Sequence, residues 1–170
     1  MSAPTMAPAR REVVDLDPVA FRRHGILAGI VGAALLAVWF LIVDLLHGHP
    51  LFTPTLLMRA LLSGGVSPAE PVEPSVALTL MFTALHGLVF AAIGFTLAEF
   101  LRRFDLVHSR ALMLVLLLSA LCVAFFTFGP IFAVVGSHGI TMQNAFIGNA
   151  LAAFGMAGYL GRALGATERG

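Results

Sequence analysis

The sequence predicts an all-α integral membrane protein, with four transmembrane helices in a compact bundle and one short interfacial helix in the first outer loop. Of its 170 residues, 59% are hydrophobic and 11% are charged, against about 25% charged residues in ordinary soluble domains. Four apolar stretches reach the roughly 20 residues that a helix needs to cross a hydrocarbon core of about 30 Å. A soluble chain of this length could not bury so much apolar surface, so lipid is the expected solvent.

The predicted organisation is one transmembrane domain between two short tails. Residues 1–16 form a disordered cytoplasmic tail, because "MSAPTMAPAR" is rich in alanine and proline. Residues 17–165 form the single four-helix domain, and residues 166–170 form the second cytoplasmic tail. The predicted spans lie at about residues 24–46, 76–100, 109–135 and 141–164, with the outer loop at 47–75.

The first span follows a helix-initiation signal. Asp17 is a typical N-cap residue and Pro18 suits the first helical position, so we expect the helix to begin there. The apolar run "HGILAGIVGAALLAVWFLIVDLL" is longer than the roughly 7–15 apolar residues of a signal peptide. We therefore interpret it as an uncleaved membrane anchor.

The outer loop contains a second initiation signal at Thr53-Pro54, followed by "TLLMRALLSGG". This pattern predicts a short helix that ends at Gly64 or Gly65. Its polar residues form one narrow stripe on an otherwise apolar surface. Such a helix is too short to cross the bilayer, so we expect it to lie in the outer interface.

The distribution of arginine predicts the orientation. All ten basic residues are arginine. Nine of them lie before the first predicted span, at or between the facing ends of the second and third, or at or beyond the end of the fourth, and only Arg59 lies in an outer loop. The positive-inside rule then places both termini in the cytoplasm, as an even number of spans also requires. The predicted location is a bacterial inner (cytoplasmic) membrane.

Two segments share the pattern A-x-x-G-x-x-x-A-A-x-G: "ALHGLVFAAIG" in the second span and "AFIGNALAAFG" in the fourth. One interpretation is a tandem duplication of two helical hairpins. The other is that small residues recur wherever membrane helices pack closely. Both interpretations predict helix-packing positions at Ala84, Gly87, Ala91, Gly94, Gly148, Ala152 and Gly155.

His86 is the deepest ionisable residue, ten residues into the second span and about 15 Å from its outer end. Ionisable groups at this depth are candidates for function, because each is costly in lipid. Three roles are compatible with this position. His86 could be a neutral imidazole that is hydrogen-bonded to Asn149, Thr83 or a carbonyl. It could instead be a proton-relay or substrate-binding group, or a ligand of haem b. Glu99, at the inner end of the same span, is expected to pair with Arg102 or Arg103.

The outer rim contains a candidate site for a divalent metal. Asp44 and His47 are three residues apart, and His49 follows after a glycine, so the three side chains could share Zn²⁺ or Cu²⁺. The alternative is a simple helix boundary, since Gly48 and Pro50 explain the turn without a ligand.

A polar cavity in the outer leaflet is the broadest site that the sequence predicts. Pro130 is expected to kink the third span near the depth where polar residues gather. The cavity could hold a lipid headgroup, a quinone ring or an ion, or be a polar plug between helices. Its expected lining residues, besides Asp44, are His86, His138, Gln143, Asn144 and Asn149.

No catalytic motif is present in the sequence, which favours a structural or accessory subunit, or a partner-binding component, of a membrane complex. An oligomeric transport or permeation unit and a haem- or metal-binding redox subunit are the alternatives. The lone Cys122 cannot form an intrachain disulfide, and a net charge of +1 gives no basis for nucleic-acid binding. The expected partners are the lipid bilayer and either further copies of the chain or other membrane subunits.

Overall fold

The regular elements of the structure, a computed structural model, are all α-helices. It describes residues 18–64, 71–103, 114, 116–118 and 141–167. The helices with assigned bounds in these ranges are α1 (Pro18–Leu46), α2 (Phe52–Ser63), α3 (Val76–Arg103) and α6 (Met142–Thr167). The predicted all-α class is therefore confirmed for the described part of the chain.

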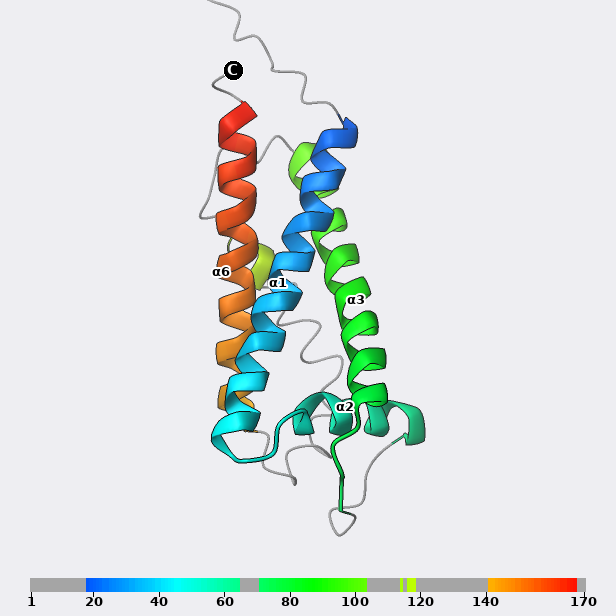
Figure 1. Ribbon diagram of the computed structural model, residues 1–170. Coiled ribbons are helices and arrows are strands. Elements are labelled where there is room, and N and C mark those ends of the chain that lie inside the picture. Colours follow the sequence, from blue (N-terminus) through cyan, green and yellow to red (C-terminus); the bar gives the residue numbers. More distant parts are fainter. Residues whose placement is uncertain (1–17, 65–70, 104–113, 115, 119–140, 168–170) are drawn as a thin grey trace, which may run out of the picture.

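The long helix α1 lies between α3 and α6 and packs against both (Figure 1). It runs antiparallel to them, so the beginning of α1 lies at the same end of the molecule as the last turns of α3 and α6. The short helix α2 lies across the opposite end, in contact with α3 and α1 (Figure 1). Helix α2 thus corresponds to the short helix that the sequence predicts in the loop between the first two long helices.

Most helix boundaries follow the sequence signals, but α2 begins at Phe52 with Leu51 before it, so the predicted start at Thr53-Pro54 lies inside its first turn. Helix α1 begins at Pro18 and α2 ends at Ser63, where Gly64 adopts the left-handed conformation with φ 74°. That conformation suits glycine, which has no Cβ. Helix α3 begins at the predicted residue, and α6 continues through Thr167, into the segment predicted as a tail. Most of the predicted span at 109–135 and the tail at 1–16 lie outside the described residues.

Two of these helices are long and apolar enough to cross a membrane, judged by length and composition. Their most apolar windows have mean hydropathies of 2.8 in α1 and 2.1 in α3. Helix α6 is long enough but does not join them. Its polar residues, among them Asn144, Asn149 and Arg162, reduce its apolar character.

Glycines allow α1 and α3 to cross in close contact. A Cβ added to Gly25 would lie 2.6 Å from the Gly94 carbonyl oxygen and 2.6 Å from the Ala98 Cβ. A Cβ on Gly29 would meet the Phe90 carbonyl oxygen, and one on Gly94 would meet the Gly25 carbonyl oxygen. Any side chain at these positions would collide with backbone, so the two helices require glycine here.

The contact between α1 and α6 uses glycine on one helix and a larger side chain on the other. The Leu36 side chain of α1 packs against Gly148 of α6, and the Leu35 side chain packs against Gly155. A second tie is polar, because the Trp39 indole nitrogen donates to the Asn144 carbonyl oxygen at 2.8 Å. Ala152, another predicted packing residue, is fully buried in the core.

The predicted row of small residues on α3 does not pack as a whole. Gly94 and Ala98 are buried, and Ala91 lies where α1 crosses, next to Gly29. Ala84 is exposed, and a Cβ added to Gly87 would meet no described atom within 4 Å. The prediction that Ala84 and Gly87 pack against a helix is therefore not met within the described residues. The reason is geometric: α1 crosses α3 around residues 90–98, so the N-terminal half of α3 diverges from it.

Candidate functional site

Asp44 anchors α2 to the end of α1. Its side chain is buried, with 4% of the residue's surface exposed. One carboxylate oxygen accepts a hydrogen bond from the Thr53 backbone N–H at 2.8 Å, and the other accepts one from the Thr53 hydroxyl at 2.5 Å. The residue before α2, Leu51, supplies no side-chain cap. Asp44 therefore caps the first turn of α2 from a different helix, where a negative charge is favourable.

The structure does not bring Asp44, His47 and His49 together as a metal site. The His47 Nδ1 atom is 2.7 Å from the Val43 carbonyl oxygen on its own helix, and His49 packs its ring beside Phe52. Within the described ranges, no three His, Cys, Asp or Glu side chains are grouped as metal ligands would be. Helix α1 stops at Leu46, so His47 and His49 do not continue its face beside Asp44. Both carboxylate oxygens of Asp44 are already bonded to Thr53.

The other side of α2 is tied to the first turn of α3 by hydroxyl groups. The Thr55 hydroxyl lies 3.3 Å from the Ser75 carbonyl oxygen and accepts a hydrogen bond from the Ser75 backbone N–H at 3.0 Å. It is also 3.4 Å from the Thr79 hydroxyl. Thr55 belongs to the polar stripe predicted for this helix, but its bond to Ser75 depends on the path of the intervening loop, which no local pattern encodes. Together with Asp44, these bonds fix α2 at both sides.

His86 lies in a row of rings along one face of α3. Its ring centroid is 5.4 Å from that of Phe82, with nearly parallel planes, and 4.6 Å from that of Phe90. The residue is partly buried. No described side chain or carbonyl forms a hydrogen bond with it, and the Thr83 hydroxyl, a predicted partner, instead donates to the Thr79 carbonyl oxygen. Among the described residues, the His86 imidazole therefore has ring neighbours but no hydrogen-bond partner.

The polar residues of α6 separate into two groups. Asn149 is partly buried, and its amide nitrogen donates to the Ala145 carbonyl oxygen of the same helix at 3.0 Å. Gln143 is exposed and Asn144 is used through its backbone by Trp39. Neither Gln143 nor Asn144 lines the large cavity between α1, α3 and α6. His138 lies outside the described residues. The predicted cavity residues are therefore brought together only in part.

A cavity of about 860 Å³ lies between the C-terminal half of α1, the N-terminal half of α3 and the beginning of α6, with α2 at its end. Both His86 and Asn149 contribute to its wall, as does Asp44 at the α2 end. The rest of the described lining is almost entirely aliphatic or aromatic, with threonines as the other polar residues. The cavity is thus an apolar volume with a few polar groups, which is the composition of small-molecule sites.

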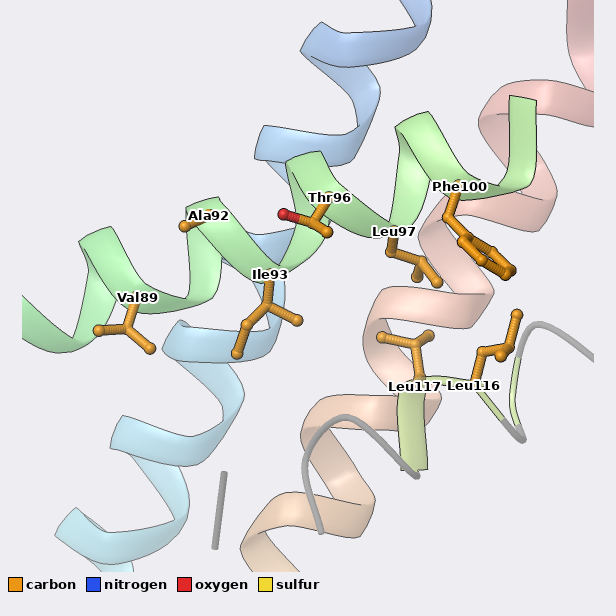
Figure 2. Close-up of a pocket in the computed structure, with 8 residues that line it drawn as sticks. All are labelled: Val89, Ala92, Ile93, Thr96, Leu97, Phe100, Leu116 and Leu117. Atoms are coloured by element: carbon orange, nitrogen blue, oxygen red, sulfur yellow. The ribbon is translucent and has the colours of Figure 1, made fainter. Parts of the chain in front are cut away.

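A second cavity, of about 470 Å³, lies along the C-terminal half of α3 (Figure 2). The side chains of Leu97 and Phe100 lie opposite those of Leu116 and Leu117 (Figure 2). Thr96 supplies the one hydroxyl group among its described lining residues. The described part of this lining is therefore almost wholly apolar, with no second polar group to orient a ligand.

The opposite end of the molecule is held by an ion-pair cluster. Glu99 of α3 pairs with Arg102 at 2.9 Å, as its spacing predicts, and also with Arg22 of α1. The Arg22 guanidinium lies 5.9 Å from the Phe95 ring centroid. Nearby, the His24 Nδ1 atom is 3.2 Å from the Tyr159 hydroxyl, which ties α1 to α6. Sequence spacing could not identify the contributions of α1, because they join residues far apart in the chain.

Comparison with protein-family models, with curated proteins and with solved structures finds no significant match to this chain. Its function must therefore be inferred from its own residues. Of the arrangements described above, the large cavity is the one that combines volume with several polar side chains in its lining. It is suited to holding an uncharged ligand, and it contains no paired acid and base around a nucleophile among the described lining residues.

Proposed function

We propose that the chain is an integral membrane protein of four spans that acts by binding, as a non-catalytic accessory subunit or partner-binding component of a membrane complex. The observation that supports this most strongly is the exposure of its apolar helices. In the most apolar window of α3, 6% of the residues are buried, and in that of α1, 28%. The core helix of a soluble protein is mostly buried, so these helices need lipid or protein partners around them.

The exposed apolar side chains are large and occur along the whole of α3. Leu80 is 64% exposed, Leu88 is 69% exposed and Phe100 is 40% exposed. Leaving such groups in water costs about 25 cal/mol for each Å² of apolar surface. A bilayer removes that cost, and so does a neighbouring membrane helix.

The two ends of the bundle support the proposed orientation in the inner membrane. Arg22, Arg23, Arg102 and Arg103 lie at the end where α1 begins and α3 finishes, while Arg59 lies in α2 at the other end (Figure 1). The positive-inside rule assigns the arginine-rich end to the cytoplasm. Helix α2 then lies at the outer surface, as expected for an interfacial helix.

Native mass spectrometry of protein extracted from its own membranes in a mild detergent tests the proposed function. We expect a complex of fixed composition that contains this chain with a second membrane protein, because the exposed faces of α1 and α3 offer a large apolar interface. The complex should persist on dilution in detergent, unlike a random co-extraction. A chain that appears only as a monomer would contradict the proposal.

The cavity favours one alternative, an oligomeric transport or permeation unit. A polar group at membrane depth, such as His86 or Asn149, is what a permeation pathway requires in otherwise apolar surroundings. The same mass measurement separates the two functions. A closed homo-oligomer without a second protein would support permeation, and a defined hetero-complex would support the accessory function.

A further inference from the structure

We propose that the large cavity binds a neutral amphiphile with a planar ring and a ring oxygen, of the quinone or quinol class. The ring would lie against the row formed by Phe82, His86 and Phe90, and its oxygen would take a hydrogen bond from His86. This proposal rests on the proposed membrane location, because such ligands are dissolved in lipid. We propose that the ligand is bound without being chemically changed. The proposed role as an accessory subunit stays as it is, with a bound ligand in addition.

The aromatic row favours a flat ligand. Phe82, His86 and Phe90 are spaced four residues apart on α3, so their rings follow one another along one face of the helix. All three line the cavity, and Phe40 of α1 also lines it. Aromatic rings prefer offset-stacked or edge-to-face contacts at centroid distances of about 4.5–7 Å. A planar ring can extend this row, whereas an acyl chain gains only non-directional contact.

The polar groups favour a ligand with an oxygen on that ring. The imidazole of His86 forms no hydrogen bond with any described residue, although the residue is partly buried. The Asn149 amide nitrogen is used by Ala145, while its side-chain oxygen has no partner among the described residues. Both residues are partly buried, so a ligand that bonded to them would satisfy polar atoms in an otherwise apolar lining. A ring carbonyl would accept from His86, and a ring hydroxyl could donate to Asn149.

The charges of the lining favour a neutral ligand over a phospholipid headgroup. Asp44 is the one carboxylate among the described lining residues, and both of its oxygens accept hydrogen bonds from Thr53. No arginine lies among those lining residues. Among the described lining residues a phosphate group would find no counter-charge, and its desolvation cost would be high. A quinone carries no charge and avoids that cost.

The volume of the cavity agrees with this class of ligand. At about 860 Å³, it lies within the range of about 300–1,000 Å³ that is typical of small-molecule sites. A substituted ring and the first part of its hydrocarbon tail fit in such a volume. The remaining tail would continue along the apolar surfaces of α1 and α3.

The single tryptophan provides a direct measurement of binding. Trp39 lies on α1 between Val38 and Phe40, both of which line the cavity. The experiment titrates decyl-benzoquinone into the full-length protein in phosphatidylcholine nanodiscs and follows quenching of Trp39 fluorescence. We expect saturable quenching for the wild type. We also expect at least tenfold weaker binding for His86→Phe, which keeps a ring but loses the hydrogen bond.

Two controls make the result specific. His49→Phe alters an exposed histidine that does not line the cavity, so it should bind as the wild type does. An alkyl ketone with the same decyl chain and no ring should fail to displace the quinone from the wild type, a comparison that needs no variant. If His86→Phe does not fold, Asn149→Leu tests the opposite wall and should also weaken binding.

The proposal is overturned if wild-type quenching is not saturable, if His86→Phe binds with wild-type affinity, or if the alkyl ketone competes as well as the quinone. The last outcome would show a general apolar cavity. None of these results would change the composition of the native complex, so failure of the ligand proposal and failure of the proposed function are separate outcomes.

Discussion

Replacing Gly94 with leucine is expected to prevent α1 and α3 from packing and to abolish the folded bundle. A Cβ at Gly94 would collide with the Gly25 carbonyl oxygen and lie 2.9 Å from the Gly29 backbone nitrogen. These atoms are backbone of a packed helix, so they cannot move aside as a flexible side chain could. We expect a loss of about 3 kcal/mol or more, measured as loss of the monodisperse peak in detergent and of the cooperative thermal transition.

Gly87→Leu is the matched control, because it makes the same chemical change on the same helix. Gly87 has no described atom within 4 Å of an added Cβ, and it faces the cavity. Since leucine also has the higher helix propensity, this variant should fold with little change in thermal stability. Equal damage from Gly87→Leu and Gly94→Leu would contradict the assignment of the α1–α3 contact to residues 90–98.

Asp44→Ala is expected to release α2 from the end of α1. The change removes two hydrogen bonds to a buried carboxylate and leaves the Thr53 N–H without its cap. Hydrogen bonds to charged groups contribute about 1.5–3 kcal/mol each, so we expect a loss of about 2 kcal/mol or more. Hydrogen exchange should show the loss locally, as faster exchange of the amides in the first turn of α2.

His47→Ala is the control for this prediction. His47 is exposed and its ring contacts a carbonyl oxygen of its own helix, so its loss should leave exchange in α2 unchanged. The two variants also distinguish the Asp44–Thr53 contact between α1 and α2 from a metal site at Asp44 and His47. If both variants lowered the stability equally, and only when Zn²⁺ was present, Asp44 would be a metal ligand after all.

Much of the fold could be predicted from local signals. Pro18 starts α1, and Gly64 follows the last residue of α2. Apolar runs located the three long helices that the structure describes. These signals depend on neighbours within one or two turns, which is why sequence alone was sufficient for them.

The site was less predictable, because its side chains find partners far along the chain or none at all. Asp44 had the spacing of a metal ligand to His47, yet its partner is Thr53 across a turn. The spacing of Glu99 predicts an ion pair with Arg102 or Arg103, but it cannot predict the observed pair with Arg22, which is 77 residues away. Gly87 has the same small side chain as Gly94, and only the crossing point of α1 distinguishes them. Pairings of this kind follow from tertiary packing, and no local pattern encodes them.

The location of Leu88 tests the central claim of membrane embedding most directly. This residue lies near the middle of α3 and is 69% exposed. With the single native cysteine replaced (Cys122→Ala), a spin label at Leu88→Cys in nanodiscs should be accessible to oxygen and protected from a water-soluble nickel complex. A label at His49→Cys should show the reverse. Equal accessibility of both labels to the nickel complex would contradict the claim.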